Sequence, residues 1–176
     1  MRIFITGGIG SGKSSFALKK AEEISEKYKI SKKIFVATAE PFDDEMRLKI
    51  QNHKKEREGL GWETREEPMN IWNAFEEEKN FLAIVDCITT WLGNIFFYFR
   101  KDMNKIDDIL ESFKRFVLSQ NFGVMIFISN ECGQGIIPQD ELTRLWLRKL
   151  SEINKFLAQM SDEVYFMVSG IPMKLK

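Results

Sequence analysis

The 176-residue sequence has one histidine, two cysteines, four prolines and no excess of charge of either sign. Two cysteines, Cys87 and Cys132, are too few for the disulfide framework of a small secreted protein, so we expect a reducing compartment, the cytoplasm. Lysine plus arginine and aspartate plus glutamate each number 26. Because the formal charge is zero, no overall field attracts nucleic acid or anionic lipid, and we expect neither as a partner.

Long apolar runs are also missing. None reaches the about 18 residues of a membrane-spanning helix. The start of the chain, "MRIFITGG", reaches Gly8 without the apolar segment of a secretory signal. We therefore expect a soluble protein without membrane insertion. The length suits one domain, residues 1–176, because no repeat, low-complexity tract or linker divides the chain.

Strand-length apolar runs alternate with segments of helical period, which predicts an α/β fold with a mainly parallel sheet and helices on both faces. A final short strand would form an antiparallel hairpin across Gly170. Apolar residues at three- and four-residue steps predict the two clearest helices, and shorter helices are expected near Lys13, over 42–57 and after Asp86. The strands are expected at 2–6, 33–38, 61–65, 81–87, 123–129, 163–169 and 171–175, and the two clearest helices at 104–120 and 139–160.

The strongest chemical signal is "GGIGSGKS", which has the spacing of a phosphate loop (P-loop). The alternative is a chance glycine-rich turn, but the loop lies between an expected strand and helix, as the motif requires. Backbone N–H groups, the helix N-terminus and the Lys13 ammonium would bind phosphates. We predict a RecA-like, three-layer P-loop NTPase fold. The expected nucleotide-binding residues here are Gly7, Gly8, Ile9, Gly10, Ser11, Gly12, Lys13 and Ser14.

A metal site is expected beside the loop. The Ser14 hydroxyl suits Mg²⁺, and Asp86 at the end of "FLAIVDC" would supply the second oxygen ligand. The other interpretation is that Asp86 caps the helix that follows it.

The only histidine, His53, lies in "LKIQNHKKER". It continues an apolar stripe of the 42–57 helix, which is typical of a histidine at the edge of a core. Lys49 and Arg57, four residues before and after, would form a cationic column with it. Such a column favours a neutral, nucleophilic imidazole that could attack a nucleotide phosphate while the two cations hold the developing charge.

The sequence resembles the bifunctional adenosylcobinamide kinase and adenosylcobinamide-phosphate guanylyltransferase family of cobalamin biosynthesis. The resemblance spans nearly the whole chain in the order of the family. Its matching stretches are "FITGGIGSGKS", "FVATAEPFDDEMRLKIQNHKKER", "GWETREEP", "IVDCITTWLGNIFF", "ISNECGQGIIP" and "SDEVYFMVSGIPMKLK".

The resemblance implies two reactions and the substrates ATP or GTP, adenosylcobinamide and adenosylcobinamide phosphate. A nucleoside triphosphate phosphorylates adenosylcobinamide, and GTP then donates GMP to that phosphate through a guanylylated histidine, which His53 matches. It also implies a homotrimer. Gly10 stands where the family usually carries an arginine.

Other features allow two interpretations each. Glu131, in "SNECGQGIIP", would contact a base or ribose, or would bind N–H groups of its own loop. Phe97 and Tyr98 point away from the expected core face of their helix and suggest a subunit contact or a corrinoid surface. Rival functions are a small-molecule kinase without guanylyl transfer and a nucleotide-dependent regulatory module.

Overall fold

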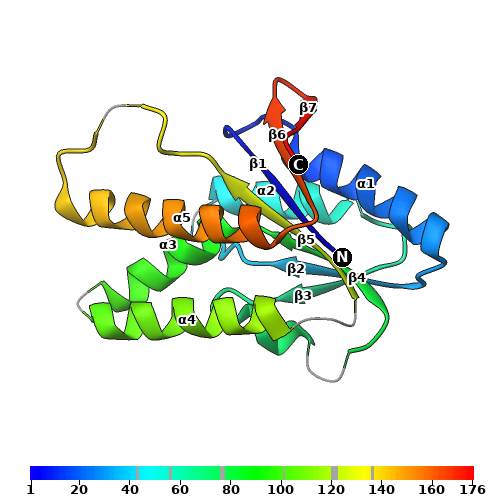
Figure 1. Cartoon of the computed structure of the whole chain (residues 1–176), viewed down its shortest axis with the longest axis horizontal. Coiled ribbons are helices and arrows are strands. Elements are labelled where there is room, and N and C mark those ends of the chain that lie inside the picture. The colour runs from blue at the N-terminus through cyan, green and yellow to red at the C-terminus, as the bar shows by residue number, and fades with distance from the viewer. Residues whose placement is uncertain (43, 56, 76–77, 101, 120–122, 136) are drawn as a thin grey trace.

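The computed structural model describes residues 1–42, 44–55, 57–75, 78–100, 102–119, 123–135 and 137–176, without the side chains of residues 45, 46, 49, 52 and 53. Strands and helices alternate along most of the chain (Figure 1). Their order is β1 Arg2–Gly7, α1 Lys13–Tyr28, β2 Lys32–Ala37, α2 Asp44–Lys55, β3 Trp62–Glu66, the 3₁₀ helix η1 Ile71–Phe75, β4 Phe81–Asp86, α3 Ile88–Phe99, α4 Met103–Ser119, β5 Gly123–Asn130, α5 Glu141–Met160, β6 Glu163–Val168 and β7 Ile171–Lys174.

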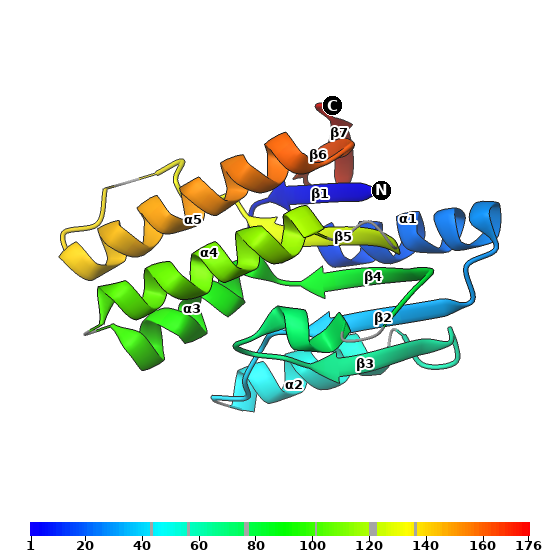
Figure 2. The same ribbon diagram turned by 60° about the horizontal axis from the view of Figure 1, so that its bottom comes forward.

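The strands form one seven-stranded sheet in the order β3-β2-β4-β5-β1-β6-β7. All neighbouring strands are parallel except β6 and β7, which form the expected antiparallel C-terminal hairpin. Helices α3, α4 and α5 cover one face and α1 covers the other (Figure 2). The three-layer α/β prediction is therefore confirmed.

Alternate residues of each central strand enter two separate cores. In β1, Ile3 and Ile5 pack in the core beneath α1, whereas Phe4 packs in the core beneath α3, α4 and α5. A strand covered on both faces needs apolar residues throughout, which explains the continuous apolar runs in the sequence. Each such buried side chain stabilises the fold by about 1.5–3 kcal/mol.

Helix α4 buries the apolar positions that its period predicted: Ile106, Ile109, Leu110, Phe113, Phe116 and Val117. The apolar face expected for α3 is also confirmed, since Trp91, Leu92, Ile95 and Phe96 are buried. None of the helices in the described ranges has the length and apolar composition that a membrane crossing needs.

Several boundaries differ from the predictions. Helix α5 begins at Glu141 rather than 139, because the Asp140 side chain accepts a 2.7 Å hydrogen bond from Thr143 N–H and caps the helix. Helix α2 ends at Lys55, so the expected extension to 57 is wrong; the N–H of Arg57 instead donates to Lys54 O in a turn. The 3₁₀ helix η1 was not predicted.

Candidate functional site

The P-loop leaves β1 at Gly7 and enters α1 at Lys13, at the carboxyl edge of the sheet. Gly12 has φ +87°, a left-handed conformation that glycine adopts without the steric cost of a side chain. A Cβ atom at Gly12 would also lie 3.3 Å from Gly170 Cα. Glycine at this position lets the loop turn sharply beside the β6–β7 hairpin.

The Lys13 side chain lies within the loop and is only 8% exposed. Its Nζ donates hydrogen bonds to Gly8 O at 2.6 Å and Gly7 O at 3.2 Å. The loop carbonyls therefore hold the ammonium group against the backbone that would bind phosphates.

The β6–β7 hairpin supports the loop from one side. Gly170 N–H donates a 3.1 Å hydrogen bond to Ser11 O. Gly170 has φ +82° and follows Ser169 at φ +48°, so the turn presents this N–H through two left-handed residues. The sequence predicted the hairpin but not its contact with the P-loop.

A cavity of about 420 Å³ lies over the loop. Ser14 and Asp86 both line it, together with residues 9–13, Ser15 and the ends of β4, α3 and β5. A hydroxyl and a carboxylate are hard oxygen donors of the kind that Mg²⁺ prefers, so the donors present fit that ion.

The alternative interpretation of Asp86 as a helix cap is wrong. The N-cap of α3 is Cys87, whose Sγ accepts from Thr90 N at 3.4 Å. Burial, followed by the Asp86 charge, raises the pKa of the Cys87 thiol. Cysteine is not among the residues preferred as N-caps, so the sequence did not indicate it as the cap.

Buried hydroxyl groups join the strand ends around this cavity. Thr38 Oγ1 accepts from Cys87 N–H and donates to Cys87 O, both at 2.8 Å, and Thr38 N–H donates to Asp86 O at 3.1 Å. Thr89 and Ser129 hydroxyls hydrogen bond at 3.1 Å. These residues were not predicted from the sequence, although polar residues end the apolar strands in "FVAT" and "FIS".

Glu131 lies beside the P-loop through its backbone, because its N–H donates to Gly7 O at 3.0 Å. Its side chain is half-buried, and the preceding residue, Asn130, lines the cavity. Burial and then the Glu131 charge raise the pKa of Cys132. Contact with a base or ribose remains a prediction for Glu131.

The predicted cationic column is only partly visible. His53 and Lys49 belong to α2 by backbone, but their side chains lie outside the described part of the structure. Arg57 lies beyond the helix and is 5% exposed, with its guanidinium carbon 3.6 Å from the centroid of the Phe35 ring. This cation–π contact ties the turn after α2 to β2. Nucleotide binding by Arg57 stays a prediction.

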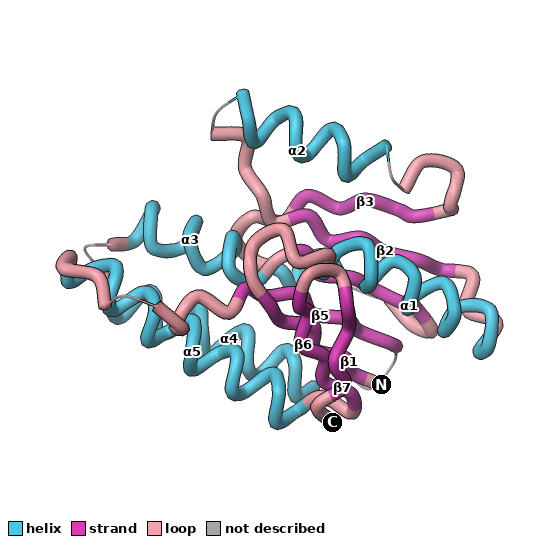
Figure 3. The backbone as a smooth tube through the Cα atoms, turned by 90° about the horizontal axis from the view of Figure 1, so that it is seen from above, coloured by secondary structure: helices cyan, strands magenta, loops and turns pink. Residues whose placement is uncertain are grey.

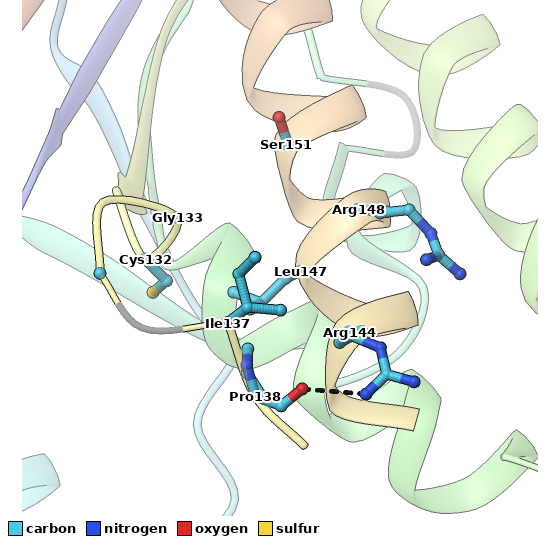
Figure 4. A pocket seen from close by; sticks show the side chains of 9 residues that line it. Cys132, Gly133, Ile137, Pro138, Arg144, Leu147, Arg148 and Ser151 are labelled. Atoms are coloured by element: carbon cyan, nitrogen blue, oxygen red, sulfur yellow. Dashed lines mark hydrogen bonds between the residues drawn. The ribbon is translucent and has the colours of Figure 1, made fainter. Parts of the chain in front are cut away.

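A second cavity, of about 310 Å³, lies between the loop after β5 and helix α5 (Figure 4). Arg144 donates a 2.9 Å hydrogen bond to Pro138 O at one side of it, while Arg148 points away from the loop. Arg144 thereby holds the chain at Pro138, just before α5, against that helix.

A glycine loop between a buried strand and a helix, with its lysine held at the loop and a carboxylate at the neighbouring strand end, defines a P-loop NTPase. The fold agrees with that of the KaiC-like protein PH0186 from Pyrococcus horikoshii OT3, with a TM-score of 0.54 and 15% identity over 94% of this chain and 69% of that chain. At that identity the likeness concerns the fold alone.

Sequence comparison assigns the chain within this class. A family model described as cobinamide kinase / cobinamide phosphate guanyltransferase matches residues 3–175. The chain is 34% identical to the bifunctional adenosylcobalamin biosynthesis protein CobP of Pseudomonas aeruginosa, over 100% of this chain and 98% of the relative. It is 27% identical to the corresponding protein CobU of Escherichia coli, over 100% of both. The chain belongs to the cobinamide kinase / cobinamide phosphate guanyltransferase family.

Proposed function

We propose that the protein phosphorylates adenosylcobinamide and then transfers GMP from GTP to adenosylcobinamide phosphate through a guanylylated His53. Family membership supports the pair of reactions. The observation that carries the proposal is a cavity lined by Lys13, Ser14 and Asp86. Asp86 pairs with Ala37 at the end of β2, the strand from which the chain continues to α2.

In the kinase reaction, the P-loop N–H groups and Lys13 hold the triphosphate in line with the acceptor hydroxyl. The hydroxyl oxygen forms a bond to the γ-phosphorus and loses its proton to water, the bond to the β-phosphate oxygen breaks, and the nucleoside diphosphate leaves. Positioning and charge neutralisation supply most of the rate enhancement in such a transfer. ATP and GTP both carry the triphosphate that the loop would bind.

Ser14 and Asp86 would hold Mg²⁺ at the triphosphate. The bound ion neutralises charge on the phosphate oxygens. The carboxylate of Asp86 lies at the end of β4, and the Thr38 backbone N–H fixes Asp86 O from the end of β2. Asp86 would thus supply one oxygen ligand from the end of β4, and Ser14 would supply the other from the start of α1.

In the guanylyl transfer, a ring nitrogen of His53 forms a bond to the α-phosphorus of GTP, and pyrophosphate leaves as the bond to the β-phosphate oxygen breaks. An oxygen of adenosylcobinamide phosphate then attacks the same phosphorus, and the N–P bond breaks to release His53. Two in-line displacements thereby replace one. Lys49 and Arg57 would stabilise the negative charge during both steps.

The family resemblance also supports a homotrimer, and the two free cysteines support a cytoplasmic location. Light scattering on the purified protein tests the first proposal. A trimer has a mass about three times the 20.6 kDa of the chain. A mass equal to that of one chain at all concentrations would contradict it.

Intact mass measurement after incubation with GTP and Mg²⁺ tests the transfer. We expect a GMP adduct on the wild-type protein, labile to acid and stable to alkali, and no adduct on His53→Ala. The matched control is Lys55→Ala, an exposed position on the same helix, which should keep the adduct. Phosphorylation without any adduct would favour the kinase-only function, and nucleotide hydrolysis without corrinoid turnover would favour the regulatory module.

A further inference from the structure

The segment that joins β2 to α2, residues 38–42 and here called the connector, runs along one side of α3. At its first residue, Thr38 O accepts a 2.7 Å hydrogen bond from the Asn94 side-chain amide. Two residues later, the Glu40 carboxylate accepts a 3.0 Å hydrogen bond from the Tyr98 hydroxyl. Both donors belong to α3, one helical turn apart.

The last residue of the connector also contacts α3. The Phe42 ring packs on the Phe97 ring with centroids 5.5 Å apart, and Phe97 also contacts Tyr98 edge-on at 5.3 Å. Asn94, Phe97 and Tyr98 lie at i, i+3 and i+4 of α3 and therefore share one side of the helix. The connector turns at Pro41, where Phe42 N–H donates a 2.9 Å hydrogen bond to Glu40 O, so Phe42 meets Phe97, one residue before Tyr98.

Asn94 is the buried part of this contact. It is 2% exposed on an otherwise mainly apolar helix, where an amide without hydrogen bonds would be costly. Its Nδ2 group donates to Pro68 O at 3.0 Å as well as to Thr38 O. Helix α2 and strand β3, with the turn between them, are here called the α2–β3 unit. Because Thr38 precedes this unit and Pro68 follows it, the Asn94 side chain binds the backbone at both ends of the unit.

Trp91, one turn earlier on α3, makes a second hydrogen bond to the segment that follows β3. Its Nε1–H donates a 2.7 Å hydrogen bond to Met69 O, next to Pro68. The α2–β3 unit is thus attached at both ends to a helix that buries Trp91, Leu92, Ile95 and Phe96 in the core.

Helix α2 itself lies outside the main helix layers, beyond the β3 edge of the sheet and apart from α3, α4 and α5 (Figure 3). The ion pair between Lys54 and Glu66, at 2.7 Å, ties it to β3, but both side chains are about half exposed. Such a pair contributes little, in the range of about 0–1 kcal/mol. The connector is therefore the stronger determinant of where α2 begins.

We propose that Asn94, Phe97 and Tyr98 are positioning residues for guanylyl transfer: by holding the connector they orient α2, and with it His53, toward a triphosphate on the P-loop. The inference rests on the proposed function and adds the residues that position His53 relative to the P-loop. The P-loop contacts none of these three residues in the described hydrogen bonds, so the kinase reaction does not depend on them in the same way.

Two variants test the inference. Asn94→Leu removes the buried donor at nearly constant volume, and the surface double variant Phe97→Ala/Tyr98→Phe removes the two outer contacts with little effect on the core. We expect GMP adduct formation to slow by about 10–100-fold, as for a nucleophile displaced by about 1 Å, while the kinase kcat and its KM for the nucleotide stay within about two-fold. The matched surface controls, Leu118→Ala on α4 and Tyr28→Phe on α1, should leave both rates unchanged.

Hydrogen exchange provides a readout independent of activity. Both variants should speed exchange in peptides covering 44–55 and leave peptides of the P-loop unchanged. Equal loss of both reactions would overturn the inference, because the three residues would then maintain the whole fold. Loss of neither reaction would also overturn it, because the three residues would then not affect the position of His53. A wild-type protein that forms no adduct would reject the proposed function; unchanged exchange in 44–55 would reject the anchoring separately.

Discussion

Lys13 carries the charge on which both proposed reactions depend. Its ammonium is bound by Gly7 O and Gly8 O and is buried in the loop, so its position is fixed by backbone rather than by flexible neighbours. The sequence predicted the P-loop and its lysine, because strand, glycines, lysine and helix are consecutive in the pattern. It did not predict the hydrogen bonds from Lys13 to Gly7 O and Gly8 O.

Lys13→Met tests that role. Methionine keeps the length of the side chain but removes the charge, so we expect phosphorylation and GMP adduct formation to fall together by about 10²–10³-fold, the range for loss of one transition-state contact. Rates of both reactions and unfolding by denaturant measure the effect. Loss of adduct with unchanged phosphorylation would show that the two reactions use different triphosphate sites.

Other single residues were harder to predict. Arg57 was expected to continue a helix and instead lies past its end on Phe35, because α2 stops at Lys55. Cys87, rather than Asp86, caps α3. The Arg57 contact involves Phe35, which is distant in sequence. The Cys87 cap is local, but cysteine is not among the residues preferred as N-caps, so the pattern did not indicate it.

Among the elements, the β6–β7 hairpin has a role that its strand pattern does not indicate. Its turn supports the P-loop through the bond from Gly170 N–H to Ser11 O. The hairpin itself was predictable from alternating residues around a glycine, whereas the contact arises only when β6 pairs with β1.

Gly170→Val tests this support. A β-branched residue at φ +82° is strained by about 1–3 kcal/mol, and the turn should shift away from the loop. We expect weaker nucleotide binding by calorimetry together with a lower free energy of unfolding. Ile171→Val, an exposed position in the same hairpin, is the control and should change neither. Nucleotide affinity equal to wild type in Gly170→Val would contradict the supporting role.

Helix α1 and strand β6 are joined by Lys20, Glu163 and Tyr165. Lys20 Nζ lies 2.9 Å from Glu163 Oε2, which also accepts from the Tyr165 hydroxyl at 2.6 Å. Burial alone would raise the pKa of Glu163, but the bonds from Tyr165 and Lys20 outweigh it and lower the pKa. A carboxylate with a lowered pKa stabilises the fold above its unfolded pKa, and this contribution is lost as pH falls through the folded pKa.

Glu163→Gln should therefore reduce the free energy of unfolding by about 1 kcal/mol at neutral pH and by less in acid. Urea unfolding at neutral pH and below the ordinary glutamate pKa of 4.5 measures the difference. A loss of stability that is the same at both pH values would show that the carboxylate charge does not contribute.

For the whole molecule, the local patterns predicted the class of fold and most elements, but not the strand order. That order places β4 and β5 between β2 and β1, which brings Asp86 and Asn130 to the P-loop cavity from distant parts of the chain. Asp86 and Asn130 come close to the P-loop only in the assembled sheet, because parallel strands align their carboxyl ends at one edge.

In the proposed mechanism, a triphosphate bound in the P-loop cavity reacts with a histidine carried by a helix outside the sheet. Peptide mapping after incubation with GTP radiolabelled at the α-phosphate tests this most directly. We predict that the label is found on the peptide containing His53 and is released when adenosylcobinamide phosphate is added. Label on any other residue, or adenosylcobinamide-GDP formed at the wild-type rate by His53→Ala, would contradict it.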